Sequence, residues 1–188
     1  MRTIQTAEVF NAIYQRRATR SYTGAAVEHA TIAELIDAAI QAPSAMNAQP
    51  WAFVVLTGAD RLSNLSQRIK TFLSTYAELA SPELRQVFAS HENLFYGAPA
   101  LVIVCATATQ RQAAEDCAMA AQNFMLAAFA CGLATCPIGL ARPWLERPEV
   151  KAELGIPADL TPVVPLALGY TRESPPSPGR RAPRIIEL

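Results

Sequence analysis

A chain of 188 residues, 51% of them apolar, is long enough for one domain with a full hydrophobic core and short for two. Sixteen basic residues balance sixteen acidic ones, so no global field favours nucleic acid or an acidic membrane, and any anion site must come from local arginines. Only 17% of the residues are charged, and this apolar surplus suggests a buried partner face.

The sequence indicates neither a targeting segment nor a metal site. The first ten residues mix polar and apolar positions without a secretory apolar core, so we expect a cytoplasmic protein. The longest apolar run, residues 117–133, contains Gln122 and Asn123 and is typical of a buried helix rather than a membrane span. For the four cysteines and two histidines we expect core or surface positions rather than a metal or redox site.

The first predicted helix covers residues 6–16 and ends in a group of arginines. Thr6 is its expected cap. Its apolar positions share one face: Val9, Phe10, Ile13 and Tyr14. The guanidinium groups of Arg16, Arg17 and Arg20 could converge on one dianion, because planar guanidinium forks bind oxygens bidentately. The alternative is that they are solvated charges at a helix C-terminus, where cations are favoured.

A stiff loop, residues 42–51, follows the second predicted helix. That helix begins in a capping-box pattern at Thr31 and ends at Pro43. Pro43 and Pro50 restrict the backbone, so the loop has little conformational entropy to lose when a ligand docks. Its small residues allow close approach, and its two amide side chains can donate and accept hydrogen bonds. The alternative is an ordinary connector into the predicted strand 52–56.

The rest of the chain alternates helical and extended patterns. Further helices are predicted at 59–72, 82–88, 116–131 and from Pro148 to Gly155. The apolar run 101–106 predicts a strand buried on both faces, and residues 133–139 lead into a short extended segment. The predicted strand 163–168 contains Pro165, which argues for an edge position or a bulge.

Two segments show no strong helical or strand pattern. The first passes through Tyr76, and we expect it to be mobile and to cover part of a pocket. The second is the tail 174–183, whose prolines keep it too extended to fold on itself. We expect the tail to cross a surface and to end in a strand-like pair, Ile185 and Ile186.

Two segments together resemble the nitroreductase family of flavin mononucleotide (FMN) enzymes. They are residues 16–22 (Arg-Arg-Ala-Thr-Arg-Ser-Tyr) and 42–51 (Ala-Pro-Ser-Ala-Met-Asn-Ala-Gln-Pro-Trp), in the family's order and spacing. The likeness continues along the chain through residues 97–99, 123–139, 167–170 and 179–183. The resemblance implies an α+β fold (an α/β sandwich) with a mixed central sheet flanked by helices, in one domain, 1–188. It also implies an interlocked homodimer with flavin sites at its interface, the tail 171–188 packing on the partner subunit.

Matched residue by residue, the family's cofactor contacts fall on four segments. Positions 16–18 match phosphate and ribityl contacts, and the basic position 20 lies near the flavin's pyrimidine edge. The loop 43–49 reaches the flavin largely from the other subunit, and the backbone of 137–139 faces the ring near N5. Positions 180 and 181 match a late phosphate-binding arginine. The full set is Arg16, Arg17, Ala18, Arg20, Pro43, Ser44, Ala45, Asn47, Gln49, Pro137, Ile138, Gly139, Arg180 and Arg181.

The cofactor would carry the hydride chemistry, so the resemblance implies no catalytic side chain. A cation such as Arg20 near N1 and O2 of the flavin makes reduction easier. The backbone N–H of Ile138 or Gly139 could bond N5, since glycine allows close approach. Two positions depart from the family pattern: Ala18 stands where serine is usual, and Pro137 where a large, often aromatic residue is common.

These matches predict an FMN-dependent oxidoreductase that takes a hydride from NADH or NADPH and passes electrons to a nitroaromatic, quinone or similar flat acceptor. No Gly-rich nicotinamide fingerprint is present, which fits a donor that stacks on the flavin. Two alternatives stay open. One is an enzyme of the same fold that uses FMN for oxidation, dehalogenation or flavin cleavage, and the other is a non-catalytic flavin-binding or anion-binding module.

Overall fold

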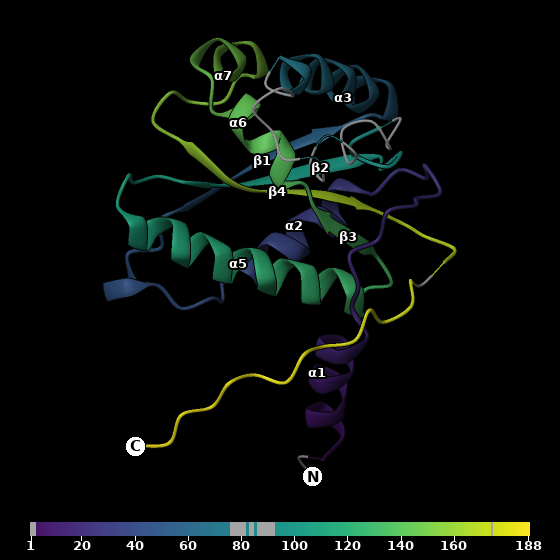
Figure 1. The fold of residues 1–188 in the computed structure, drawn as a ribbon, viewed down its shortest axis with the longest axis vertical. Helices are drawn as coiled ribbons and strands as arrows, with labels where there is room; N and C mark the ends of the chain where they lie inside the picture. The colour runs from purple at the N-terminus through teal and green to yellow at the C-terminus, as the bar shows by residue number, and fades with distance from the viewer. Residues whose placement is uncertain (1–2, 76–81, 83–84, 86–92, 174) are drawn as a thin grey trace.

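A four-stranded sheet lies at the centre of the fold, in the order β1-β2-β4-β3 (Figure 1). The computed structural model describes residues 3–75, 82, 85, 93–173 and 175–188. The strands are β1 (Trp51–Thr57), β2 (Ala100–Ala106), β3 (Ala134–Pro137) and β4 (Thr161–Gly169). All their pairings are antiparallel. The sheet is therefore not the mixed one predicted, since parallel pairing among the described residues is confined to an isolated bridge between Ala18 and Thr135.

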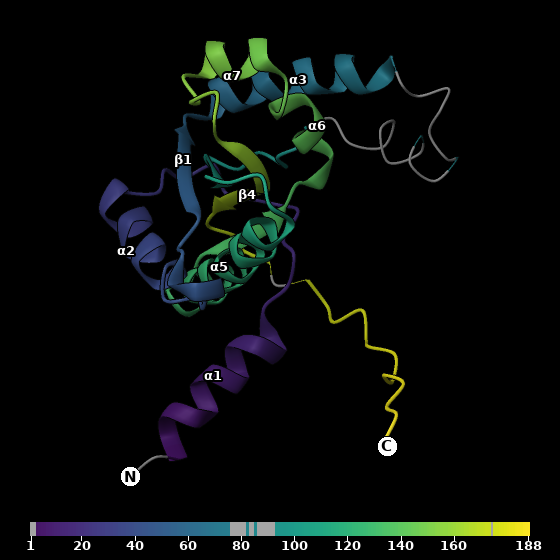
Figure 2. The same cartoon turned by 90° about the vertical axis from the view of Figure 1, so that its left-hand side faces the viewer.

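Helices cover both faces of this sheet, which confirms the predicted α+β sandwich (Figures 1 and 2). One face carries α2 (His29–Ala39) and α5 (Arg111–Ala130). The other face carries α3 (Ala59–Ser74), α6 (Arg142–Leu145) and α7 (Pro148–Leu154). Two short 3₁₀ helices, η1 (Ala45–Asn47) and η3 (Gly139–Ala141), lie in the connections.

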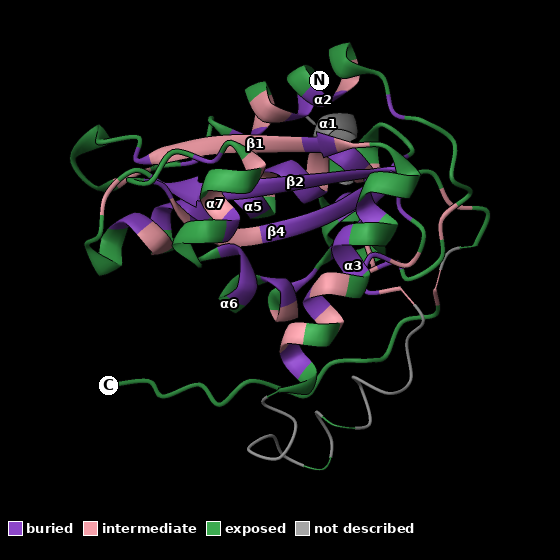
Figure 3. Cartoon of the chain, turned by 90° about the horizontal axis from the view of Figure 1, so that it is seen from above, coloured by how far each residue is buried: buried purple, intermediate pink, exposed green. Residues whose placement is uncertain are grey.

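Strand β2 supplies the centre of both cores. Its odd-numbered residues, from Leu101 to Cys105, join the core beneath α3, whereas its even-numbered residues, from Ala100 to Ala106, join the core beneath α5. This alternation follows from the two-residue period of a strand. Every residue of β2 is buried (Figure 3), which confirms the prediction of a strand covered on both sides.

Helix α1 (Thr3–Gln15) and the C-terminal tail extend away from these layers (Figures 1 and 2). The prediction that Thr6 caps α1 is wrong, because α1 already begins at Thr3 and Thr6 lies inside it. The predicted start at Thr31 is also wrong, because α2 begins two residues earlier, after Glu28, which makes no side-chain capping bond. Helix α5 likewise begins at Arg111 instead of residue 116.

Two predictions fall on the part of the chain that is not described. The helix expected at 82–88 lies outside the described residues apart from Pro82 and Arg85, which are helical. The segment beyond Thr75, expected to cover a pocket, also lies outside them. Within the described ranges, no helix combines the length and the apolar character that crossing a membrane requires.

Pro165 lies in an interior strand, so of the two predicted alternatives the edge position is wrong, whereas an irregularity of the bulge type does occur, two residues earlier. Strand β4 pairs with β2 on one side and β3 on the other, and the pairing shifts at Val163, where the strand has one residue more than β2. The carbonyl of Pro165 accepts the N–H of Ile138 at 2.8 Å. Because the N–H and C=O of one strand residue face the same side, the missing N–H of Pro165 also points toward β3, which has ended at Pro137.

Gly169, the last residue of β4, allows close packing against Pro99 and Tyr22. A Cβ at this position would lie 2.6 Å from Cδ of Pro99 and 3.0 Å from Cδ1 of Tyr22. We expect Gly169→Ala to lower the free energy of unfolding by about 1–3 kcal/mol, the usual effect of overpacking. Urea denaturation measures the change. Gly139→Ala is the matched control, since its Cβ would meet nothing within 4 Å, and equal stability losses in both variants would contradict the packing argument.

Candidate functional site

Two arginines directly after α1 carry buried N–H groups that have no acceptor. Nη1 of Arg17 donates to the carbonyl oxygens of Tyr14 at 2.6 Å and Arg16 at 2.7 Å. Nη1 of Arg16 and Nε of Arg17 are buried, and the described residues offer neither of them an acceptor. Neither side chain belongs to an ion pair found among those residues. An anion is the natural partner for two such donors, because an unpaired buried charge is costly.

Like charges gather around Arg16. Burial is the main cause that lowers its pKa, and the positive charges of Arg17 and Arg180 lower it further. Arg180, in the tail, is therefore electrostatically part of this cluster. Arg181, also predicted to bind phosphate, is exposed on the tail, and no described contact joins it to Arg16. Three neighbouring cations that belong to no ion pair among the described residues favour a multiply charged anion.

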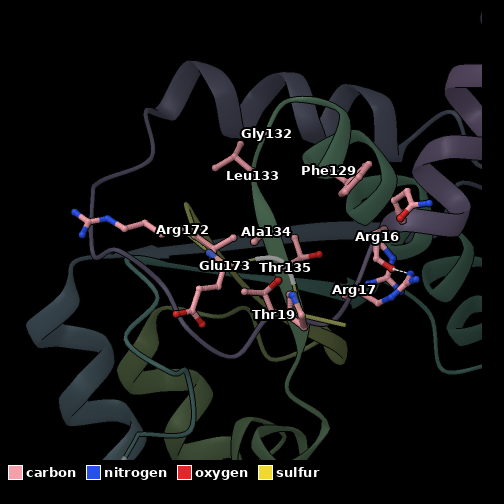
Figure 4. Close-up of a pocket in the computed structure, with 13 residues that line it drawn as sticks. Arg16, Arg17, Thr19, Phe129, Gly132, Leu133, Ala134, Thr135, Arg172 and Glu173 are labelled. Atoms are coloured by element: carbon pink, nitrogen blue, oxygen red, sulfur yellow. Dashed lines mark hydrogen bonds between the residues drawn. The ribbon is translucent and has the colours of Figure 1, made fainter. Parts of the chain in front are cut away.

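The arginines line a cavity of about 250 Å³ beside strand β3 (Figure 4). Thr19 donates its backbone N–H to the carbonyl of Thr135 at 3.0 Å, which ties the arginine segment to the strand. The hydroxyl of Thr135 is buried without a partner among the described residues, so it too can bind a ligand oxygen. Arg172 and Glu173 also line the cavity. Sequence reasoning missed Thr19, Thr135, Arg172 and Glu173, although the first two lie inside segments it had singled out.

Arg20 follows two residues after Ala18, which is bridged to Thr135 of β3. Its guanidinium carbon is 6.0 Å from the centre of the Tyr96 ring. The fields of Arg20 and Arg16 both act on the thiol of Cys136, whose pKa is nevertheless raised because it is buried. Burial also raises the pKa of Tyr22, which donates a long hydrogen bond of 3.4 Å to the carbonyl of Ala167. The structure thus brings Arg16, Arg17 and Arg20 together along one strand, with Ala18 bridged to it.

Of the three predicted residues at the end of β3 and just after it, one has a backbone donor that no described residue occupies. Pro137 is exposed and has no N–H. Ile138 is buried, and its N–H is used in the bond to Pro165, so it cannot serve a ligand as predicted. Gly139 is exposed at the start of η3, and no described residue accepts its N–H. Of the two residues proposed to face the flavin N5, the geometry favours Gly139.

The loop 43–49 is held in an unusual backbone conformation. Met46, Asn47 and Gln49 all have left-handed φ angles, of 53°, 54° and 48°. The N–H of Gln49 donates to Oγ of Ser44 at 3.0 Å, and its side-chain amide donates to that of Asn47 at 3.2 Å. Most of the loop is exposed, including Pro43 and Ala45. A stiff loop that presents amides to its surroundings is what the sequence predicted.

The loop and the arginines lie at opposite ends of α5 (Figure 1). Ala45 bonds Asp116 in the first half of that helix, whereas Phe129 near its end lines the cavity with Arg16. At 1.5 Å per residue, these two helix positions are about 20 Å apart. One chain alone therefore does not unite the predicted flavin-binding residues. It carries them in two separate groups, each of which would be half of the predicted site.

The described residues hold no group of three His, Cys, Asp or Glu side chains that could bind a metal ion. The four cysteines are free thiols, and only Cys131 is exposed. Metal chemistry therefore has no candidate site in the described parts of the chain, and the cavity at Arg16 is the main candidate for function.

Comparison with known proteins identifies relatives along most of the chain. The model of the nitroreductase family matches residues 13–170. Nitroreductase NfnB of Mycolicibacterium smegmatis is 30% identical in an alignment 202 positions long, which covers 90% of this chain and 85% of that protein. A nitroreductase structure with bound FMN from Bacteroides fragilis is 30% identical, with a TM-score of 0.78 and coverage of 96% and 99%. The structure of NfnB in complex with NADPH aligns with a TM-score of 0.67 at 23% identity, covering 95% and 100%.

Arg16→Met should change stability in opposite directions with and without phosphate. A base whose pKa is lower in the folded state destabilises the fold while it is charged, so the variant should unfold at a higher temperature than wild type in phosphate-free buffer. It should also lose most of the stabilisation that inorganic phosphate gives to the wild type. Calorimetry in both buffers measures the two effects.

Arg142→Met is the matched control, because Arg142 is part of an exposed ion pair with Glu146 and does not line the cavity. It should respond to phosphate as the wild type does. A wild-type protein that phosphate does not stabilise would argue against an anion site at Arg16.

Proposed function

The chain belongs to the nitroreductase family, and from that membership we propose that it is an FMN-dependent oxidoreductase. It takes a hydride from NADH or NADPH and passes electrons to a flat acceptor such as a nitroaromatic or a quinone. The relatives support this reading, because one is a nitroreductase solved with FMN and another was solved with NADPH. The observation that carries the proposal is the pair of buried guanidinium donors without an acceptor at Arg16 and Arg17.

The cavity beside β3 suits the phosphate end of the cofactor. Arg16 and Arg17 would hold the phosphate oxygens, and the hydroxyl of Thr135 adds a third donor that has no other use in the described structure. The neighbouring charge of Arg180 would come from the tail, which makes Arg180 rather than Arg181 the better candidate for the late phosphate contact. Ala18 lacks the usual serine hydroxyl, and Thr135 could replace that contact.

The ring end would lie beside Arg20 and Gly139. Bound flavin supplies the hydride chemistry, so the protein contributes binding and electrostatics. A cation such as Arg20 stabilises negative charge on the pyrimidine side, and the N–H of Gly139 is available to hold an acceptor atom of the ring edge. No side chain is assigned a catalytic proton transfer.

We propose that the site is completed by a second subunit. The two half-sites lie at opposite ends of α5, so a two-fold arrangement of antiparallel α5 helices would bring the loop of one chain to the arginines of its partner. Ser44, Ala45, Asn47 and Gln49 would then contact the flavin from the other subunit.

Exposed apolar surface supports the same homodimer. On α1 the exposed fractions of Val9, Phe10, Ile13 and Tyr14 are 59%, 52%, 49% and 66%. The rings of Phe10 and Tyr14 stack on each other with their centres 6.1 Å apart, so this face already forms one apolar surface. Ile185 and Ile186 in the tail are also exposed. An apolar face of this kind is typical of a subunit interface, and the tail 171–188 would pack on the partner.

Anaerobic absorption spectroscopy tests the function directly. We expect the purified protein to show a flavin spectrum, or to acquire one when FMN is added, and NADH or NADPH should bleach it. Adding a nitroaromatic or a quinone should then restore the oxidised spectrum. A flavin that neither donor bleaches would contradict the nicotinamide-dependent reductase, and a protein that binds no FMN would contradict the whole proposal.

Mixed dimers test whether the site is shared. Arg16→Ala disables the phosphate end, and Asn47→Gly removes a loop amide while permitting the left-handed φ of 54°. Each variant homodimer should bind FMN more weakly than wild type. For Arg16→Ala the binding free energy should fall by about 1.5–3 kcal/mol, because a charged contact is lost. A dimer with one subunit of each kind should hold one intact site and one doubly defective site.

Purified mixed dimers should therefore bind half as much FMN as wild-type dimers, at FMN concentrations that leave both homodimers unoccupied. A dimer of wild type with Arg16→Ala is the control and should also fill one site. If the loop served the flavin of its own chain, the mixed dimer would have no intact site and would stay unoccupied.

A further inference from the structure

A carboxylate is buried beneath the loop 43–49. Asp116 on α5 is only 1% exposed. Its Oδ2 accepts the backbone N–H of Ala45 at 3.3 Å, and its Oδ1 accepts the side-chain amide of Gln112 at 3.1 Å. None of the ion pairs found among the described residues includes it. A buried carboxylate that accepts hydrogen bonds only from neutral donors costs free energy. We therefore ask what Asp116 does for the loop.

The loop that Asp116 contacts is strained. Three left-handed φ angles occur within four residues, none of them at glycine, and each costs on the order of 1 kcal/mol or more. Such a conformation persists only where surrounding contacts impose it. The bonds from Gln49 to Ser44 and Asn47 lie inside the loop and do not attach it to the domain.

Within the described structure, three hydrogen bonds attach the loop to the domain, two at its C-terminal end and one at its N-terminal end. At its C-terminal end, the carbonyl of Pro50 accepts the N–H of Thr107 at 3.0 Å and the thiol of Cys117 at 3.4 Å. At the N-terminal end, Asp116 binds the N–H of Ala45, the first residue of η1. Asp116 and Cys117 are neighbours on α5, so one turn of this helix holds both ends of the loop.

We propose that Asp116 is a positioning residue for flavin binding, which holds the loop so that Asn47 and Gln49 face the flavin of the partner subunit. A charged acceptor suits this task, because a hydrogen bond to a carboxylate is about twice as strong as one between neutral groups. The inference rests on the proposed function, since it assigns a purpose to the loop only if the loop contacts flavin.

Substitutions at both ends of the Asp116–Ala45 bond test the proposal. Asp116→Ala removes the acceptor, and Asp116→Asn keeps an acceptor of the same shape without the charge. Ala45→Pro removes the donor and leaves the core untouched, because Ala45 is exposed and begins η1, where proline is favoured, after an extended Ser44. Glu115→Ala is the matched control, an exposed carboxylate next to Asp116 that pairs with Arg111.

FMN affinity, measured by quenching of flavin fluorescence, should fall about tenfold or more in Asp116→Ala and Ala45→Pro, as expected when a hydrogen bond to a charge is lost. Asp116→Asn should give an affinity between those of wild type and Asp116→Ala, because it keeps an acceptor but only a neutral one, and Glu115→Ala should equal wild type. Amide hydrogen exchange of residues 44–49 should speed up in the two impaired variants. Their stabilisation by inorganic phosphate should not change, since the phosphate donors are those of Arg16, Arg17 and Thr135 and the loop contributes none of them.

The outcomes distinguish a failure of the Asp116 proposal from a failure of the proposed function. If the wild type binds FMN and Ala45→Pro binds it equally well, Asp116 is not a positioning residue, while the reductase proposal stands. The same conclusion follows if phosphate stabilisation falls together with FMN affinity, because the change is then global. A wild-type protein without affinity for FMN overturns both.

Discussion

The guanidinium groups at the end of α1 are the constraint on which the rest of the site depends. Arg16 and Arg17 bury donors that no described residue satisfies, and Arg180 adds a like charge nearby. A folded chain tolerates such repulsion only because packing elsewhere offsets it, and the cores on both sides of β2 supply that packing. If the site binds an anion as proposed, stability is lowered here in favour of binding, which is the usual relation between a binding site and its scaffold.

Helix α5 determines how the site is divided. It is one continuous helix of twenty residues. Its first half holds the strained loop through Asp116, and its last turn lines the cavity of the arginines. Within one chain the two half-sites stay apart, because this helix lies between them. The same feature that separates the half-sites makes a second copy of the chain the natural way to join them.

Local patterns predicted those elements whose chemistry is local. The arginine cluster, the proline-bounded loop and the doubly buried strand β2 could all be read from spacing and residue type. What could not be predicted depends on distant partners. Pro165 is tolerated inside the sheet because β3 ends beside it, and Ile138 loses its N–H to that same residue. Thr135 meets the arginine segment through the Ala18 bridge, and Arg172 lines the same cavity because it follows β4, which pairs with β3.

The 20 Å between the half-sites has a thermodynamic consequence. If each flavin contacts two chains, cofactor binding and subunit association are linked, and each strengthens the other by the same factor. Dilution would then strip the flavin even though every direct contact is intact in the assembled form. The supply of cofactor in a cell would in turn control how much of the protein is assembled, so the amount of active enzyme would rise more steeply than the amount of chain.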